Sequence, residues 1–223
     1  MGKIIVIEGT DCSGKETQSK LLVEKLNKMG IKAIQLSFPM YETPTGKIVG
    51  GAYLGKEDIG PCLFPEGSVN LDPKIASLYY AADRKYNIKL VKDYIKEDYI
   101  VVLDRYVSSN MAHQGCKIID KDERFKMFDW IDKLEYWLLE LPKPELTIFL
   151  YVPHQYSFAL KKERKISDNH EKDENYLINA ENTYLELSGL YNWKTINCIK
   201  DEGLKSITEI NEEIIKYLDI KKD

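Results

Sequence analysis

Cysteines are few in this sequence, and long hydrophobic runs are absent. The four cysteines, at positions 12, 62, 116 and 198, form no C-x-x-C pair, which argues against a zinc site and against a secreted disulfide framework. No apolar stretch approaches the roughly 20 residues that span a bilayer, and the run at residues 4–7 is too short for a signal-peptide core. We therefore expect a cytoplasmic protein with free thiols and no membrane partner.

A strong excess of charge of one sign is also missing. The chain has 36 acidic and 32 basic residues, a net charge of -4, and both signs are mixed along most of its length. This distribution indicates neither a nucleic-acid surface nor an acidic tail. At 223 residues and 43% apolar content, the chain can bury one substantial core, so we expect a single domain over residues 1–223.

Strand-like and helix-like segments alternate along the chain. Residues 3–8 are apolar on both faces and rich in β-branched side chains, which is typical of a central strand in a parallel sheet. Leu22, Leu26 and Met29 share one face of the helix that follows, and Gly30 suits the position just past its end. Further strands are expected at about 32–37, 99–103, 146–152 and 194–198, and further helices at about 73–97, 107–139 and 174–190 and through Ile207, Ile210, Ile214 and Leu218. The pattern predicts a doubly wound α/β parallel sheet of about five strands, with ligands at the carboxyl ends of the strands.

Residues 50–72 do not follow this alternation. The segment is rich in glycine and proline, which punctuate loops and turns. We expect it to form an excursion on the surface.

The stretch GTDCSGKE at residues 9–16 follows the phosphate-binding pattern G-x-x-x-x-G-K between a strand and a helix. Backbone N–H groups of such a turn approach phosphates closely, and the helix N-terminus adds partial positive charge. Lys15 would bridge the outer phosphates. The predicted nucleotide-binding set is Gly9, Thr10, Asp11, Cys12, Ser13, Gly14, Lys15, Glu16 and Thr17.

Glu16 occupies the position where the pattern has a serine or threonine. That hydroxyl normally contacts Mg²⁺, and Thr17 lies about 100° further round the helix, so Thr17 is a poor substitute. A carboxylate can coordinate Mg²⁺ directly or through its waters, and it can also repel phosphate. Glu16 is therefore a candidate metal ligand, and its effect on catalysis is left open.

Asp104 and Arg105 follow the predicted strand at 99–103. An Asp at the carboxyl end of a strand beside the phosphate loop can hold the waters of a metal ion, and an Arg can grip a second phosphate bidentately. Taken alone, the pair is equally compatible with a structural ion pair at a helix start.

The chain resembles the thymidylate kinase family of P-loop nucleoside monophosphate kinases from residue 3 to nearly its end. The resemblance rests on the order of five segments besides the phosphate loop, which are SFPMY at 37–41, SLYYAADR at 77–84, DRY at 104–106, KKERKISDNHEKDENYL at 161–177 and TYLEL at 183–187. It implies a P-loop NTPase-type fold with a small lid at about 161–173, and a homodimer.

The resemblance also implies roles for particular residues. The substrate-binding set for dTMP would be Phe38, Pro39, Tyr41, Tyr80, Arg84, Arg105, Asn110, His113 and Gln114. Asp104, Asp11 and Glu16 would be the metal-binding residues, and Lys15, Arg105, Arg164 and Asp11 the catalytic ones. ATP and Mg²⁺ would be the cofactors.

The chemistry of thymine agrees with two of these positions. Tyr80 and Arg84 lie four residues apart on one helix face, where they can offer an aromatic platform and a donor to O4. Cytosine has a donor amine in place of O4, so two donors would face each other. The pair therefore favours thymine or uracil over cytosine.

The sequence departs from the family at several positions. Cys12 stands where some members have a catalytic arginine, so the lid cations Lys161, Lys162, Arg164 and Lys165 are candidates for that role, and Arg164 is preferred for its planar guanidinium. His113 stands where the family often has a tyrosine close to C2′ of the sugar. Met40 and Tyr41 stand where some members have an arginine that holds the acceptor phosphate.

These observations favour a dTMP kinase that uses ATP and Mg²⁺. Two alternatives remain. One is a related kinase for another deoxynucleotide or for a deoxynucleoside, for which His113 and residues 50–72 leave room. The other is a non-catalytic nucleotide-binding module in which Glu16 has weakened metal binding.

Overall fold

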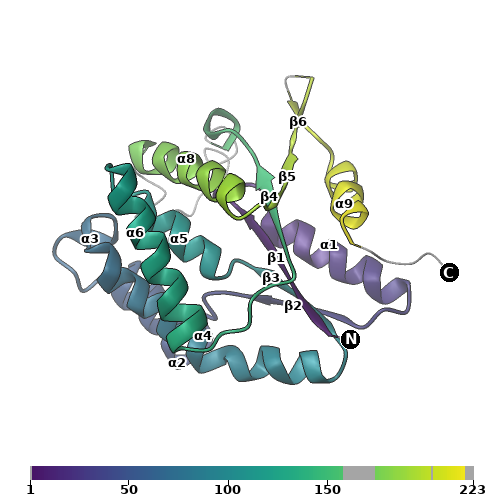
Figure 1. The fold of residues 1–223 in the computed structure, drawn as a ribbon, viewed down its shortest axis with the longest axis horizontal. Coiled ribbons are helices and arrows are strands. Elements are labelled where there is room, and N and C mark those ends of the chain that lie inside the picture. The colour runs from purple at the N-terminus through teal and green to yellow at the C-terminus, as the bar shows by residue number, and fades with distance from the viewer. Residues whose placement is uncertain (1, 158–173, 202, 219–223) are drawn as a thin grey trace.

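A five-stranded parallel sheet forms the centre of the computed structural model, which describes residues 2–157, 174–201 and 203–218 (Figure 1). Its strands are β1 (Lys3–Gly9), β2 (Ala33–Ser37), β3 (Ile100–Asp104), β4 (Leu146–Tyr151) and β5 (Lys194–Asn197). They lie in the order β2-β3-β1-β4-β5, and each pair of neighbours is parallel. The predicted doubly wound α/β fold is thereby confirmed.

Helices cover both faces of the sheet (Figure 1). One face carries α1 (Lys15–Lys28) and α9 (Ile207–Lys216), and the other carries α4 (Pro73–Lys96), α5 (Val107–Gly115), α6 (Lys121–Asp132) and α8 (Glu174–Leu190). A π-helix, η2 (Lys133–Leu138), continues α6, and a short antiparallel pair, β6 (Ile199–Lys200) and β7 (Gly203–Leu204), precedes α9. No helix in the part of the chain that the structure describes is long and apolar enough to cross a bilayer.

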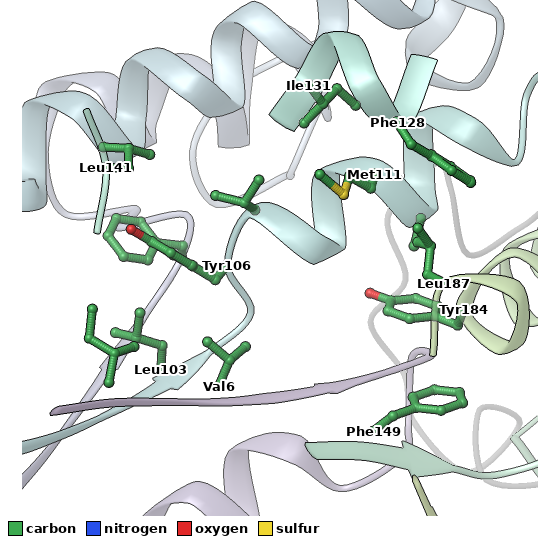
Figure 2. Packing of buried hydrophobic residues seen from close by; sticks show 14 of the residues in the cluster. Val6, Leu103, Tyr106, Met111, Phe128, Ile131, Leu141, Phe149, Tyr184 and Leu187 are labelled. Carbon is green, nitrogen blue, oxygen red and sulfur yellow. The ribbon is translucent and has the colours of Figure 1, made fainter. Parts of the chain in front are cut away.

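Successive side chains of the central strand β1 serve two separate cores. Ile5 and Ile7 pack with the apolar residues of α1 and α9, whereas Ile4 and Val6 pack with those of α4, α5, α6 and α8. Because side chains alternate along a strand, a strand that is covered on both faces needs apolar residues on both, as at residues 4–7 of β1. Figure 2 shows the second core, in which Phe149 of β4 stacks on Tyr184 of α8 with ring centroids 5.4 Å apart.

The expected face of α1 is correct except at its last residue. Leu22 and Leu26 are fully buried, whereas Met29 is 49% exposed. Helix α1 ends at Lys28, and Gly30 adopts a left-handed φ of +75° that turns the chain towards β2. Met29 lies beyond the last residue of the helix, so the 3.6-residue period does not determine its exposure. The expectation that it shares the face of Leu22 and Leu26 is therefore wrong.

The expectation that residues 50–72 form a surface excursion is correct for the exposed residues of the segment and wrong for its buried ones. The segment contributes to a small third core that includes residues of the π-helix η1 (Ile48–Tyr53) and Ala76 of α4. Val49 and Tyr53 are fully buried, and Leu54 nearly so. Short helices α2 (Pro44–Lys47) and α3 (Gly67–Asn70) flank the η1 turn. The glycines and prolines of residues 50–72 favour a loop in a sequence-based prediction. The apolar residues between them become buried only when the segment packs against α4.

Lys117, just beyond α5, attaches the segment of this third core to the rest of the molecule. Its Nζ donates to the carbonyl oxygens of Ser68 at 2.9 Å and Leu71 at 3.1 Å. Burial lowers the pKa of Lys117 to about 8. Residues 50–72 are thus attached at several points and can present side chains to a site in defined positions.

The predicted lid at 161–173 lies outside the described residues, and so do Lys161, Lys162, Arg164 and Lys165. The expectation of one domain over residues 1–223 stays a prediction.

Candidate active site

The phosphate loop joins β1 directly to α1. A Cβ added at Gly9 would lie 2.4 Å from the hydroxyl oxygen of Ser13 and 2.9 Å from the carbonyl oxygen of Leu150, so only glycine fits there. Gly14 precedes α1 with a left-handed φ of +81°, and no side chain caps the helix. The first N–H groups of α1 therefore have no side-chain acceptor, which leaves them available to donate to a bound anion such as a phosphate.

Lys15 is buried within this loop. Its Nζ donates to the carbonyl oxygen of Thr10 at 2.7 Å and lies 3.5 Å from the Ser13 hydroxyl. Burial and the positive charge of Arg105 together lower the pKa of Lys15 to about 8, against the opposing effect of Asp11 and Asp104. These electrostatic interactions place the lysine among the predicted metal-binding and catalytic residues.

Asp104 and Arg105 lie at the carboxyl end of β3, next to the end of β1. Asp104 pairs in register with Ile7, and its buried Oδ1 has no hydrogen-bond partner among the described residues. Arg105 has a left-handed φ of +67°, and its guanidinium bonds to Asp11 of the phosphate loop, with Nη2 2.5 Å from Oδ1. The arginine thus pairs with an acid across the site, and not with its neighbour Asp104.

His113 of α5 contacts the same guanidinium. Its Nε2 lies 3.1 Å from Nη1 of Arg105, and its Nδ1 lies 2.9 Å from the hydroxyl of Tyr176. Because a guanidinium can only donate, Nε2 must accept, and the imidazole proton is assigned to Nδ1. His113 therefore orients Arg105 besides facing the substrate cavity.

A cavity opens beside the phosphate loop, between residues that lie far apart in the sequence. Its lining is Asp11, Phe38, Pro39, Tyr41, Leu54, Lys56, Tyr80, Arg84, Arg105, Ser109, Asn110 and His113. With the exception of Gln114, all the residues predicted to bind substrate are found here. Gln114 is fully buried, and its side-chain atoms have no partner among the described residues. It lies about 100° round α5 from His113, which turns it away from the cavity.

Arg84 is held by a residue that sequence reasoning missed. Glu135 of η2 accepts hydrogen bonds from Nε and Nη2 of Arg84, the latter at 2.6 Å, and both side chains are almost completely buried. Asn110 donates to the same carboxylate at 2.8 Å. One carboxylate thus orients two of the predicted base-binding residues. The available signal was a lone acid in the otherwise apolar run LEYWLL.

Glu8 is a second acid that was missed, although it ends the apolar run of β1. Its carboxylate accepts hydrogen bonds from the hydroxyls of Ser108 at 2.7 Å, Ser109 at 2.6 Å and Tyr184 at 3.1 Å, and from the backbone N–H of Tyr106 at 3.1 Å. These bonds join β1, the start of α5, and α8 directly behind the phosphate loop.

Glu16 is not brought to the predicted metal-binding residues. It lies on the exposed side of α1, where its side chain is 68% exposed and contacts Nζ of Lys20 at 2.5 Å. Thr17 is also exposed. No group of three acidic, histidine or cysteine side chains within the described ranges is arranged to hold a metal ion.

The parallel sheet, the phosphate loop at the end of β1 and the adjoining cavity define a P-loop nucleotide kinase. The family model for thymidylate kinase matches residues 7–214, so this chain belongs to the thymidylate kinase family.

Individual relatives agree with this assignment. The chain is 34% identical to the probable thymidylate kinase of Methanocaldococcus jannaschii, over 96% of this chain and 94% of the relative. It is 31% identical to human thymidylate kinase, over 96% of this chain and 88% of the human one. The structure of Candida albicans thymidylate kinase matches with a TM-score of 0.71 at 26% identity, over 96% of this chain and 90% of the other.

Replacing Glu135 with alanine is expected to destabilise the protein by about 3–5 kcal/mol, because it leaves the buried Arg84 guanidinium without its counter-charge. Urea unfolding would measure the loss, with Asp129→Ala as a control because the Asp129–Lys133 pair is exposed. The double variant Arg84→Met, Glu135→Leu should recover most of the stability. A Glu135→Ala protein as stable as the control would contradict the role given to this pair.

The pH dependence of ATP use should report the state of Lys15. Its pKa of about 8 lies below the ordinary 10.5, so the free enzyme loses this charge as pH rises through 8, and kcat/KM for ATP should fall there. The free energy of unfolding should change in the opposite direction. Between pH 8 and 10.5 the folded protein no longer buries the charge of Lys15 while the unfolded chain still carries it, so stability rises with pH.

Lys117 provides the control for this measurement, because its pKa is also about 8 but it holds residues 68–71 and does not line the cavity. The alkaline limb should persist in Lys117→Met and move to higher pH in Lys15→Arg. If the alkaline limb disappeared in Lys117→Met, the limb would report Lys117, and its assignment to Lys15 would be wrong.

Proposed function

We propose that this enzyme transfers the γ-phosphate of ATP to dTMP, forming dTDP for dTTP synthesis. The observation that carries the proposal is the position of the phosphate loop directly beside a cavity that contains Tyr80, Arg84 and Arg105, in a chain of the thymidylate kinase family. The loop suits the phosphates of ATP, and the cavity suits a pyrimidine nucleoside monophosphate.

ATP would bind with its phosphates on residues 9–17 and with Lys15 at the outer phosphates. Arg105 would hold the acceptor phosphate, since its guanidinium lies in the cavity and already contacts Asp11 of the loop. Asp11 would accept from the sugar hydroxyl once a phosphate competes for Arg105. The two substrates would then meet at the Asp11–Arg105 pair.

The base would be recognised by Arg84 and Asn110 against the aromatic rings of Phe38 and Tyr80, which all line the cavity. Glu135 occupies Nε and Nη2 of Arg84, whereas Nη1 makes only a long contact of 3.4 Å to the carbonyl oxygen of Tyr106. Nη1 is thus the natural donor to O4 of thymine. The amine of cytosine would leave two donors opposed, so dCMP should be a poor acceptor.

The residues present fit a magnesium ion at Asp104. Its buried Oδ1 lacks a partner among the described residues, and Mg²⁺ is commonly bound by one or two carboxylates with substrate phosphates and waters. When bound, the metal would neutralise charge on the β- and γ-phosphates. Glu16 suits this role less well, because its exposed carboxylate contacts Lys20.

The reaction needs positioning more than covalent chemistry. An oxygen of the acceptor phosphate attacks the γ-phosphorus in line as the bond to the β-phosphate oxygen breaks, and Lys15 and Arg105 stabilise the charge of the transition state. No strong base is required, because a phosphate monoester is largely deprotonated at neutral pH. Arg164 stays a predicted third cation, outside the described residues.

The experiment is ADP formation with dTMP, dUMP, dCMP, dGMP, UMP and thymidine as acceptors, with and without Mg²⁺. We expect turnover with dTMP, at least about 10-fold less with dCMP, and none after chelation. Asp104→Asn should need about 10- to 100-fold more Mg²⁺, with Asp98→Asn, just before the other end of β3, as the matched control.

Turnover confined to another acceptor would move the function to the alternative kinase and would implicate His113 at the sugar. Binding of ATP without turnover of any acceptor would favour the non-catalytic module instead.

We also propose a homodimer. Helix α4 exposes an apolar stripe formed by Ile75, Leu78, Ala82, Tyr86 and Leu90, on the face opposite Tyr80 and Arg84. A contiguous exposed stripe of this kind is typical of an interface. The cytoplasmic location stays a prediction from the sequence.

Light scattering after size-exclusion chromatography should give twice the mass of the chain. Leu78→Glu should yield monomers, whereas Leu63→Glu, on an exposed leucine away from α4, should not. A monomeric wild-type protein at micromolar concentration would exclude the proposed dimer.

A further inference from the structure

The acceptor cavity contains three cationic side chains, and two of them have acidic partners. Arg84 is paired with Glu135, and Arg105 is paired with Asp11. Lys56 lines the same cavity, and the one contact that its ammonium makes among the described residues is with the ring of Tyr41, 5.0 Å from Nζ to the ring centroid. Lys56 is therefore the cationic residue of the cavity that has no acidic partner in the described part of the chain.

The backbone at Lys56 is held in place. Its N–H donates to the carbonyl oxygen of Gly50 at 2.9 Å, and its carbonyl oxygen accepts from Ile59 and Gly60, each at 2.9 Å. Leu54, two residues before Lys56, is buried in the third core and also lines the cavity. Lys56 therefore projects from a packed support, which limits the entropy lost when its ammonium binds a ligand.

The charge of the acceptor requires such a cation. A phosphate monoester carries a charge of about -1.5 to -2 at neutral pH, whereas the Asp11–Arg105 pair has no net charge. Met40 and Tyr41, which follow Phe38 and Pro39 at the rim, contribute no positive charge of their own. Tyr41 contributes instead a ring face, which attracts an ammonium ion through its quadrupole.

We propose that Lys56 binds the phosphate of the acceptor nucleotide, and that Tyr41 is a positioning residue that holds the Lys56 ammonium beside the cavity. The proposal rests on the proposed function, since it takes the cavity to be the acceptor site. It assigns a substrate contact to the segment 50–72. In this arrangement Arg105 and Lys56 share the phosphate of the acceptor.

The test compares ligands with and without the phosphate. Calorimetric binding of dTMP and of thymidine is measured for the wild type and for Lys56→Met, which keeps the length of the side chain and removes its charge. We expect about 10- to 100-fold weaker binding of dTMP, the range for a lost charge-assisted hydrogen bond, and unchanged binding of thymidine. In steady-state kinetics, KM for dTMP should rise, while KM for ATP stays constant.

Three further variants make the result specific. Lys47 lines a neighbouring surface hollow together with Lys56 but does not line the acceptor cavity, so Lys47→Met removes a nearby charge and should change dTMP binding less than about twofold. Lys56→Arg should keep most of the affinity. Tyr41→Leu should weaken the binding of dTMP by about threefold more than that of thymidine, because it removes the cation–π contact that holds the Lys56 ammonium.

Equal losses for dTMP and thymidine in Lys56→Met, or unchanged binding of both with normal kinetics, would overturn the proposal. So would a fall in kcat without a change in KM for dTMP, which would place Lys56 at the transferring phosphate. If the wild type bound dTMP through Lys56 but transferred no phosphate to it, the proposed function would fail and the Lys56 contact would stand. Thermal unfolding of each variant excludes loss of the fold as the cause.

Discussion

The buried carboxylate of Glu8 is the interaction on which the site depends. It lies next to the last residue of the central strand, immediately before the phosphate loop, and accepts hydrogen bonds from Ser108, Ser109, Tyr184 and the backbone of Tyr106. A buried carboxylate is tolerated only when its oxygens are hydrogen-bonded, so its donors must take up these positions when the protein folds. Since Gly9 follows Glu8 and Arg105 precedes Tyr106, this requirement fixes the phosphate loop relative to the acceptor cavity.

Counter-charges within the protein prepare the cavity for its ligand. Asp11 and His113 hold Arg105, and Glu135 holds Arg84 and Asn110. A guanidinium that is already oriented loses little freedom when it binds a phosphate or a base, and it does not have to reorganise during the reaction. The desolvation of these charges costs stability, which the hydrogen bonds offset in the folded protein. The same chemistry that stabilises the buried pairs therefore determines which ligand atoms fit.

Much of the fold could be predicted because its signals are local. The β-branched run before Gly9, the spacing from Gly9 to Lys15 and the helix at 174–190 each depend on neighbours along the chain. The buried positions of residues 50–72 could not be predicted in this way, because Tyr53 and Leu54 are buried by contacts with α4 and not by a regular period. Met29 shows the same limit on a smaller scale, since the end of α1 and the turn at Gly30 decide its exposure.

For this protein, the sequence by itself determined the parallel α/β architecture, the phosphate loop and the residue types available for a nucleotide, because periodicity and motif spacing act over a few residues. Tertiary structure alone decided which charges meet. Glu135 lies 51 residues from Arg84, and Asp11 lies 94 residues from Arg105. It also turned Gln114 and Glu16 away from the positions expected of them and brought Lys56 into the cavity. Contacts over such separations are set by the sheet order and by packing between helices, and no local pattern encodes them.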